Sequence, residues 1–396
     1  MSETGAVNTV PASAEAAPRA ADARTRPGSL ARTLPPERLL EVRNLKKYFP
    51  IKGGFFGGTV GAVRAVDDVN LHVDTGEILS LVGESGCGKT TTSRCVLRAV
   101  NPTSGEILFR LGDDEVVDVA KLSDRELRPL WRNMQMIFQD PFGSLNPRKN
   151  LFDIIGEPLL VNGVRSRQER MDRVAELLGL GGLRPGYMHR YPHAFSGGQR
   201  QRVVIARALA LNPKLVVADE AVSALDVSVQ AQILNLLLEL QERLGLSYLF
   251  VAHDLSIVKH ISHRVAVMYV GKVVETAPTD PLFHAPLHPY TSALMAAVPQ
   301  ADPRRRGEMI RLEGEVATPA KPPSGCYFHP RCPFATDQCK AEAPALREVR
   351  PGHFVACHRA EELDLPGVQS GSAVQAVAEA QGWSPGSRRR RRRPGV

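Results

Sequence analysis

The chain has 396 residues, of which 43% are hydrophobic and 23% charged, and this ordinary composition excludes collagen-like, wholly disordered and small disulfide-rich proteins. The formal charge is +8, but six positive charges lie in Arg388–Arg393, so the rest of the chain carries only +2. A nearly neutral body gives little support for specific nucleic-acid binding. The length predicts two or three domains.

Composition divides the chain into four segments. Residues 1–37 are rich in Ala, Pro, Ser and Thr without periodicity, which predicts a disordered leader. Residues 38–285 alternate strand-like and helical stretches, which predicts an α/β fold with a helical insertion at about 140–210. Frequent Pro and His and four clustered cysteines predict a small second domain at 286–360, and the low-complexity, Arg-rich residues 361–396 predict a disordered tail.

Membrane and export signals are missing from the sequence. It has no run of about 18 apolar residues, the length that a membrane-spanning helix needs, and its N-terminal stretch lacks the apolar core of a secretory signal. We therefore expect the chain to stay in the cytoplasm, where cysteines are thiols or metal ligands rather than disulfides.

The strongest motif is GESGCGKT, which fits the phosphate-binding pattern G-x-x-x-x-G-K-[ST] between a strand-like run and a helical stretch. Backbone N–H groups of such a loop bind phosphates, Lys89 reaches the outer phosphates, and Thr90 can bind magnesium. The predicted phosphate-binding residues are Gly83, Glu84, Ser85, Gly86, Cys87, Gly88, Lys89, Thr90 and Thr91.

Two further segments fit phosphate chemistry. The apolar run LVVADE ends in Asp219, a predicted magnesium ligand, and Glu220, which could orient or deprotonate an attacking water. FSGGQRQR places Ser196, Gly197 and Gly198 at the start of a helix, which is either a second anion-binding site or an ordinary helix cap.

These motifs together resemble the ATP-binding subunits of ABC transporters, over about Leu40 to Ala360. GESGCGKT resembles Walker A, LVVADE resembles Walker B, and FSGGQ resembles the signature motif, with Phe195 where leucine is usual. Gln139 in IFQD resembles the Q-loop, SALD from Ser223 to Asp226 resembles the D-loop, and His253 in VAHD resembles the switch histidine. Ala221 stands where the family usually has proline.

The resemblance implies a RecA-like P-loop NTPase core that hydrolyses ATP with magnesium. It also implies a head-to-tail dimer, in which the signature motif of one domain (Ser196, Gly197, Gly198 and Gln199) covers the γ-phosphate held by the other, with Asp226 nearby. On this basis Glu220 polarises the water and His253 contacts the γ-phosphate. Thr90, Gln139 and Asp219 are the residues expected to contact magnesium. Gln139 senses the ion and also links the site to a membrane partner.

An aromatic residue before the phosphate loop is predicted to stack on adenine. Phe49 is our preferred residue because it follows Leu45 by four positions, as the family aromatic does, whereas Tyr48 is one position off. The Gly-rich stretch from Pro50 to Val66 resembles the F-type subunit of dipeptide and oligopeptide importers.

The cysteines follow the pattern C-x5-C-x6-C-x17-C: Cys326, Cys332, Cys339 and Cys357. A loop-rich segment with a small hydrophobic core needs an additional stabilising link, and in the cytoplasm a metal supplies this more readily than disulfides do. Four thiolates suit either zinc or an iron–sulfur cluster. Zinc sites usually contain C-x2-4-C pairs, which are lacking, so the spacing favours a cluster. The surrounding segments, HPYTSALMAAVP and SGCYFHPRCPFATDQC, resemble the C-terminal extension of peptide and nickel importer ATPases, which implies a structural 4Fe-4S cluster.

The predicted function is an ATPase subunit that powers import of dipeptides or oligopeptides from the cytoplasmic face of the membrane, to which it binds peripherally. The resemblance implies two permease subunits, a sister ATPase in a heterodimer and an extracytoplasmic peptide-binding protein as partners. Import of nickel or another small solute is the alternative within the subfamily. A soluble ABC ATPase is the competing class, but such proteins usually fuse two cassettes and this chain has one.

Overall fold

The computed structural model describes residues 34–53, 58–113, 115–296 and 314–368. The predicted leader up to Thr33, the tail from residue 369 and Arg388–Arg393 lie outside the described residues. Within the described ranges, no helix has both the length and the apolar character needed to cross a membrane.

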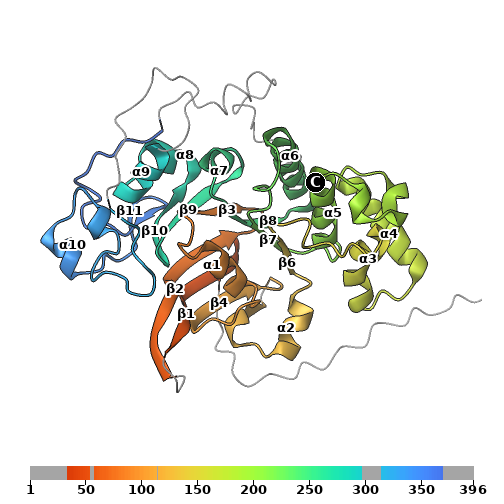
Figure 1. Cartoon of the computed structure of the whole chain (residues 1–396), viewed down its shortest axis with the longest axis horizontal. Helices are drawn as coiled ribbons and strands as arrows, with labels where there is room; N and C mark the ends of the chain where they lie inside the picture. Colours follow the sequence, from red (N-terminus) through yellow and green to blue (C-terminus); the bar gives the residue numbers. More distant parts are fainter. Residues whose placement is uncertain (1–33, 54–57, 114, 297–313, 369–396) are drawn as a thin grey trace, which may run out of the picture. The chain divides into compact units, whose positions relative to one another are not determined.

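Among the described residues the largest sheet has eight strands, in the order β11 (Arg347–Arg350), β12 (His353–Val355), β10 (Lys272–Pro278), β9 (Arg264–Tyr269), β3 (Ile78–Val82), β8 (Ser247–Val251), β7 (Leu215–Asp219) and β6 (Met134–Ile137) (Figure 1). Strands β6, β7, β8, β3 and β9 pair in parallel, and β10, β12 and β11 continue the sheet antiparallel. Every residue of β3, β7 and β8 is buried, as expected where both faces of a parallel sheet are covered.

The two faces of this sheet pack into different hydrophobic clusters. In β3, Ile78 and Val82 join the cluster that contains the helices between β6 and β7, whereas Leu79 and Leu81 join the cluster that contains α1 (Lys89–Val96). Successive side chains of a strand point to opposite faces, so one short apolar run supplies both cores.

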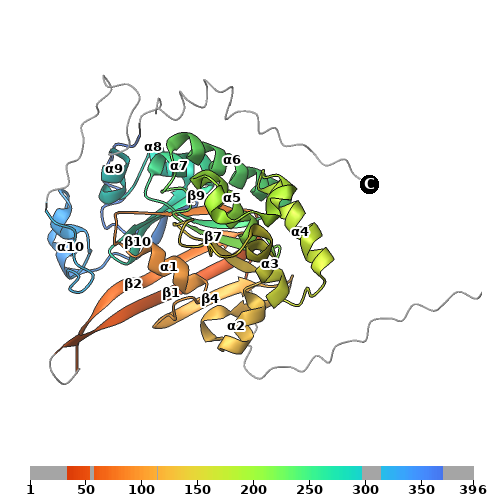
Figure 2. The same cartoon turned by 45° about the vertical axis from the view of Figure 1, so that its right-hand side comes forward.

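A second sheet has the order β2 (Gly58–Asp74), β1 (Arg38–Gly53), β4 (Ser104–Arg110) and β5 (Val116–Asp118). Figure 2 shows α1 beside the strands β1 and β2 of this sheet, and buried residues of the sheet, such as Val42 and Val69, share a hydrophobic cluster with Cys95 and Val96 of α1. The helix that follows the phosphate-binding motif is therefore packed between the two sheets.

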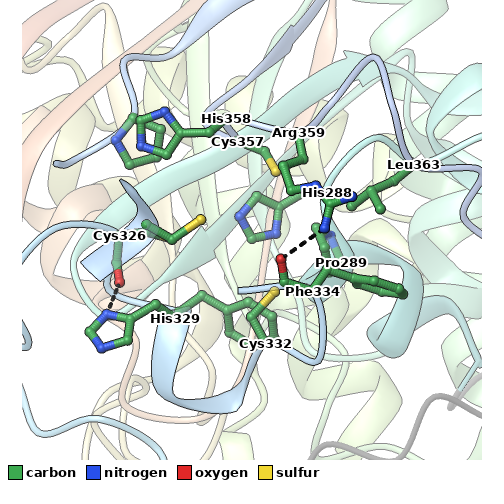
Figure 3. A pocket seen from close by; sticks show the side chains of 13 residues that line it. His288, Pro289, Cys326, His329, Cys332, Phe334, Cys357, His358, Arg359 and Leu363 are labelled. Atoms are coloured by element: carbon green, nitrogen blue, oxygen red, sulfur yellow. Dashed lines mark hydrogen bonds between the residues drawn. The ribbon is translucent and has the colours of Figure 1, made fainter. Parts of the chain in front are cut away.

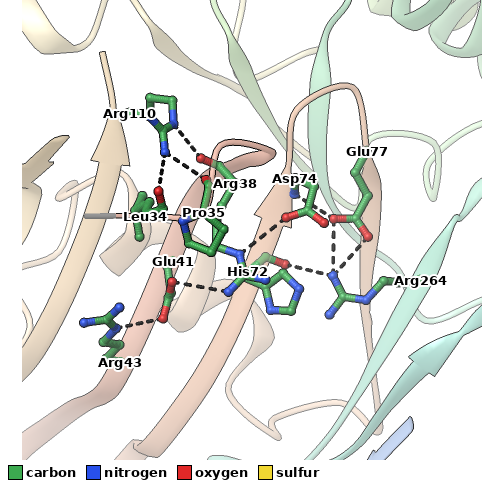
Figure 4. A network of polar contacts seen from close by, with 10 residues as sticks. All are labelled: Leu34, Pro35, Arg38, Glu41, Arg43, His72, Asp74, Glu77, Arg110 and Arg264. Atoms are coloured by element: carbon green, nitrogen blue, oxygen red, sulfur yellow. Dashed lines mark hydrogen bonds and ion pairs between the residues drawn. The ribbon is translucent and has the colours of Figure 1, made fainter. Parts of the chain in front are cut away.

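A network of ion pairs and hydrogen bonds lies where the chain passes from β2 of one sheet to β3 of the other (Figure 4). Arg264 of β9 contacts Glu77 at 3.1 Å, and Glu77 accepts a hydrogen bond from the Asp74 backbone at 2.7 Å. Arg38 of β1 contacts Asp74 at 3.4 Å. Burial of Glu77 raises its carboxyl pKa, and the nearby Arg264 opposes that shift.

In the sequence, three α-helices separate β6 from β7: α3 (Leu151–Val161), α4 (Arg167–Leu180) and α5 (Gly197–Ala208). These helices pack on one another. Asn150 and Ser166 cap the first two by accepting hydrogen bonds from backbone N–H groups. The remaining helices are α2 (Asp124–Leu130), α6 (Val227–Leu244), α7 (Leu255–Ile261), α8 (Thr279–His284), α9 (Pro289–Ala296) and α10 (Asp337–Ala341), with 3₁₀ turns η1 (Val119–Lys121), η2 (Pro185–His189), η3 (Pro192–Ala194) and η4 (His329–Arg331).

The C-terminal region, where the sequence predicts a small second domain at 286–360, packs closely against the main α/β core. Its strands β11 and β12 extend the central sheet through β10, and Phe328 packs against Tyr269 of β9 with ring centroids 5.3 Å apart. The fully buried carboxylate of Glu275 on β10 accepts hydrogen bonds from the Leu287 backbone at 2.6 Å and from His353 at 2.6 Å. These buried contacts join the cysteine-bearing region to the central sheet.

The packed chain also extends beyond the predicted boundaries at 37 and 361. Leu34 is buried, and its carbonyl accepts a hydrogen bond from Arg110 at 2.8 Å. Leu365 and Val368 are buried as well, and the Val368 backbone donates to the Phe283 carbonyl at 2.7 Å. Isolated apolar residues in polar stretches have no periodic pattern, so composition alone does not reveal that these flanking residues are packed.

Candidate functional site

The phosphate loop lies between the end of β3 and the start of α1, where the sequence placed it. Two of its glycines have left-handed backbone conformations that no other residue could occupy. A Cβ atom on Gly83 would lie 2.1 Å from the Met268 carbonyl oxygen, and one on Gly88 would lie 2.1 Å from the Ala65 carbonyl oxygen. The loop is therefore held tightly against β9 and β2.

Lys89 and Thr90 make different contacts. The Lys89 ammonium is buried and donates to the carbonyl oxygens of Gly83 at 2.8 Å and Glu84 at 3.0 Å. The Thr90 hydroxyl donates to Asp219, at the end of β7, at 3.1 Å. Burial raises the pKa of Asp219, and the Thr90 hydrogen bond and Arg94 counteract it. The structure thus brings together Thr90 and Asp219, the two oxygen-bearing side chains that the sequence predicts as magnesium ligands.

Two residues predicted to act in hydrolysis, Gln139 and His253, converge on the carboxylate of a third, Glu220. Gln139 donates from Nε2 to Glu220 Oε2 at 2.8 Å, and His253 Nδ1 lies 3.5 Å from the same oxygen. Glu220 and His253 follow the parallel strands β7 and β8, whose carboxyl ends meet at the same edge of the sheet. Gln139 contacts Glu220 rather than the Thr90–Asp219 pair.

The backbone of Glu220 has a positive φ of 49°, which is uncommon for a residue other than glycine. Its N–H donates to the Val251 carbonyl at 3.0 Å, and its own carbonyl accepts from the Ser223 hydroxyl at 3.0 Å. Ala221, where proline is usual, is buried. These contacts fix the direction in which the carboxylate points.

The signature-like segment lies at the start of α5. Ser196 and Gln199 form a reciprocal capping box, with hydrogen bonds of 3.4 and 3.2 Å. Gly198 lies so close to α6 that a Cβ atom would stand 2.4 Å from Val229. In the described part of the chain, no hydrogen bond or ion pair joins this segment or the exposed Asp226 to the phosphate loop. Phe195 is a core residue that packs edge-on against Tyr187.

The two adenine-stacking candidates have different surroundings. The Tyr48 hydroxyl donates to Asp67 at 2.5 Å, and burial together with this carboxylate raises the tyrosine pKa. Phe49 is 41% exposed, with the Lys47 ammonium 4.8 Å from its ring centroid. Phe49 is therefore the more exposed of the two rings.

The four clustered cysteines line one small cavity of about 20 Å³, together with His288, His329 and His358. Figure 3 shows the thiols of Cys326, Cys332 and Cys357 turned toward this space. All four are free thiols, and burial is the main cause that raises the pKa of Cys332 to about 11 and of Cys357 to about 12. Nowhere in the described ranges do three or more His, Cys, Asp or Glu side chains stand close enough to hold a single metal ion.

Sequence reasoning missed several contacts from this cysteine region to the phosphate loop. Arg331, between Cys326 and Cys332, pairs with Glu84 at 2.9 Å, and the Tyr290 hydroxyl accepts from the Glu84 backbone at 2.9 Å. The residues are more than 200 positions apart, so no local pattern could reveal them.

Comparisons with known proteins give consistent matches. The ABC transporter family matches residues 66–223, and the family described as "Oligopeptide/dipeptide transporter, C-terminal region" matches residues 274–339. The chain is 54% identical to the oligopeptide transport ATP-binding protein AppF of Bacillus subtilis, over 81% of this chain and 97% of that protein. It is 45% identical to the di/tripeptide transport ATP-binding protein DppF of Pseudomonas aeruginosa, over 83% of this chain and 99% of that protein.

A solved structure gives an independent match to the fold. It is a dimeric ATP-binding cassette in a post-hydrolysis state bound to ADP and Pi, 29% identical, with a TM-score of 0.53 over 61% of this chain and 99% of that chain.

Proposed function

The chain belongs to the family of ATP-binding subunits of oligopeptide and dipeptide ABC transporters, and on that premise we propose which of its residues bind and hydrolyse ATP. The family identifies it as the ATP-hydrolysing subunit of a peptide importer, a peripheral subunit that works with membrane permeases and a substrate-binding protein. The observation that carries the proposal is the convergence of Gln139 and His253 on Glu220, beside the Thr90–Asp219 pair.

Glu220 is the proposed general base. Its carboxylate accepts a proton from the attacking water, while Gln139 holds the carboxylate in place and His253 lies 3.5 Å from the same carboxylate oxygen. Thr90 and Asp219 would hold magnesium, which supplies positive charge to the phosphates when bound. Lys89 binds the outer phosphates, and Phe49 stacks on adenine through its exposed ring.

The signature-like segment is proposed to act on a second ATPase subunit. Ser196–Gln199 begins a twelve-residue helix, α5, whose N-terminal N–H groups suit an anion. In this chain the segment makes no described contact with its own phosphate loop, and the solved relative is dimeric. We infer that it covers the ATP held by a sister ATPase in a head-to-tail heterodimer.

The permease is proposed to dock in an apolar groove of about 760 Å³ beside Gln139. Its lining includes the exposed aromatic side chains of Trp131 and Phe138, with Pro158 and Ala208 contributed by the α3–α5 segment. Phe138 directly precedes Gln139, so an occupant of the groove would lie next to the residue that contacts Glu220. The occupant we propose is an apolar cytoplasmic segment of the permease, which places the chain on the cytoplasmic face.

Reconstitution tests this assignment. We expect that the chain, assembled in liposomes with its two permeases and sister ATPase, hydrolyses ATP faster when peptide-loaded binding protein is present. Replacing Phe138 by aspartate should lower the stimulated rate and co-purification with the permeases, because a charge would be desolvated in the groove. Glu239→Gln on exposed α6 is the matched control. Hydrolysis indifferent to every membrane partner would favour a soluble ATPase instead.

The four cysteines are proposed to hold a 4Fe-4S cluster with a structural role. Four thiols line one cavity, and thiolate sulfur is the ligand such clusters use. A zinc ion would need its ligands about 2.3 Å from one metal centre, and the described side chains form no such group. The preference for a cluster over zinc rests on the sequence, which lacks the C-x2-4-C pairs usual in zinc sites.

Anaerobic purification tests the cluster. We expect iron and acid-labile sulfide with visible absorbance, and we expect Cys332→Ser to lose most of the iron. Cys95→Ala is the matched control, because Cys95 is buried in α1 away from the cavity. Stoichiometric zinc, or iron that survives the Cys332 change, would contradict the proposal.

A further inference from the structure

We infer that Arg331, in the cysteine-bearing region, is a positioning residue for ATP binding because it holds the phosphate loop through Glu84. The inference rests on the proposed role of Gly83–Thr90 as the ATP phosphate loop. It assigns a function to the C-terminal region within the ATPase reaction itself, beyond holding a cluster.

The ion pair between Arg331 and Glu84 is bidentate. Arg331 Nη1 lies 2.9 Å from one Glu84 carboxylate oxygen and 3.3 Å from the other, and Nη2 lies 3.2 Å from the second. The Arg331 side chain is 8% exposed, and that of Glu84 is 26% exposed. A bidentate pair of this kind fixes the orientation of the carboxylate as well as its distance from the guanidinium.

Arg331 is itself held in place by its own short turn. It ends η4, between Cys326 and Cys332, and its backbone donates to the Phe328 carbonyl at 3.0 Å. Phe328 is fully buried against Tyr269 and Tyr290. The guanidinium is therefore presented to Glu84 from a rigid part of the core.

The main chain of Glu84 is held on both sides. Its N–H donates to the Tyr290 hydroxyl at 2.9 Å, and its carbonyl accepts from the Lys89 ammonium at 3.0 Å. Tyr290 lies on α9 and is fully buried. The contacts form a continuous chain from Arg331 through Glu84 to Lys89, the residue proposed to bind the outer phosphates.

The same cysteine loop makes a second contact near the nucleotide site. The hydroxyl of Tyr327 donates to Asp67 at 2.6 Å, on the oxygen opposite the one bound by Tyr48. Tyr48 is the neighbour of Phe49, the proposed adenine platform. The loop from Cys326 to Cys332 thus contacts both Glu84 of the phosphate loop and Asp67, the hydrogen-bond partner of Tyr48.

The test is a double-mutant cycle on the full chain. Arg331→Gln and Glu84→Gln should each raise the KM for ATP about fivefold, equivalent to about 1 kcal/mol, with kcat changed less than about twofold. The double variant should resemble either single variant, because both changes break the same contact. Arg331→Lys should keep only part of the affinity for ATP, since lysine lacks the planar guanidinium that forms a bidentate pair.

Arg347→Gln is the matched control. Arg347 makes a similar two-pronged pair with Glu361, at 2.6 Å, on the exposed β11 strand away from the phosphate loop. It should leave the KM unchanged. An unchanged KM in Arg331→Gln, or additive effects in the double variant, would overturn the inference. If Lys89→Ala still bound ATP normally, the assignment of Gly83–Thr90 as the ATP phosphate loop would be contradicted instead.

Discussion

Replacing Glu220 by glutamine lowers kcat for ATP hydrolysis by about 100-fold to 10,000-fold, the range that a positioned general base contributes, while ATP binding changes little. Glutamine keeps the shape of the side chain and can still hydrogen-bond to Gln139, but its amide cannot accept a proton from water. The reaction is blocked after binding. We therefore expect the variant to accumulate an ATP-bound dimer with the sister ATPase, detectable by size-exclusion chromatography.

The control is Glu242→Gln, which removes an equal charge from an exposed position of α6. It should leave kcat unchanged. A Glu220→Gln protein that hydrolyses ATP at the normal rate would show that another group activates the water.

Replacing Lys89 by alanine weakens ATP binding about 10-fold to 100-fold, because a hydrogen bond from a charged group contributes about 1.5–3 kcal/mol. Thermal unfolding measures this directly. At an ATP concentration 100 times the original Kd, the unaltered chain gains about 2.7 kcal/mol of stability, whereas a variant with 100-fold weaker binding gains about 0.4 kcal/mol.

Lys121→Ala is the matched control, since Lys121 is 62% exposed and pairs with Glu106 and Asp118 far along the chain from the loop. Its stabilisation by ATP should equal that of the unaltered chain. Full stabilisation of Lys89→Ala by ATP would move the phosphate site elsewhere. Unfolding without nucleotide separates a binding defect from a general loss of stability.

The packing of the C-terminal region is not visible in composition. Pro, His and Cys between 286 and 360 predict a small second domain, and in the structure Phe328 and Tyr290 of this region belong to the main hydrophobic cluster and β12 pairs with β10. An aromatic residue in a loop-rich segment carries no periodic signal, so the sequence does not reveal which core it joins.

The sequence by itself determined the family and the phosphate loop, because glycines, a lysine and a threonine at fixed spacing bind phosphate through local backbone geometry. It also determined the buried strands β3, β7 and β8, whose apolar runs are continuous. Only the tertiary structure decided that Gln139, 81 residues before Glu220, contacts its carboxylate, and that Arg331, 247 residues after Glu84, clamps the loop. Contacts at such separations depend on strand order and on packing between faces, and neither leaves a trace in local spacing.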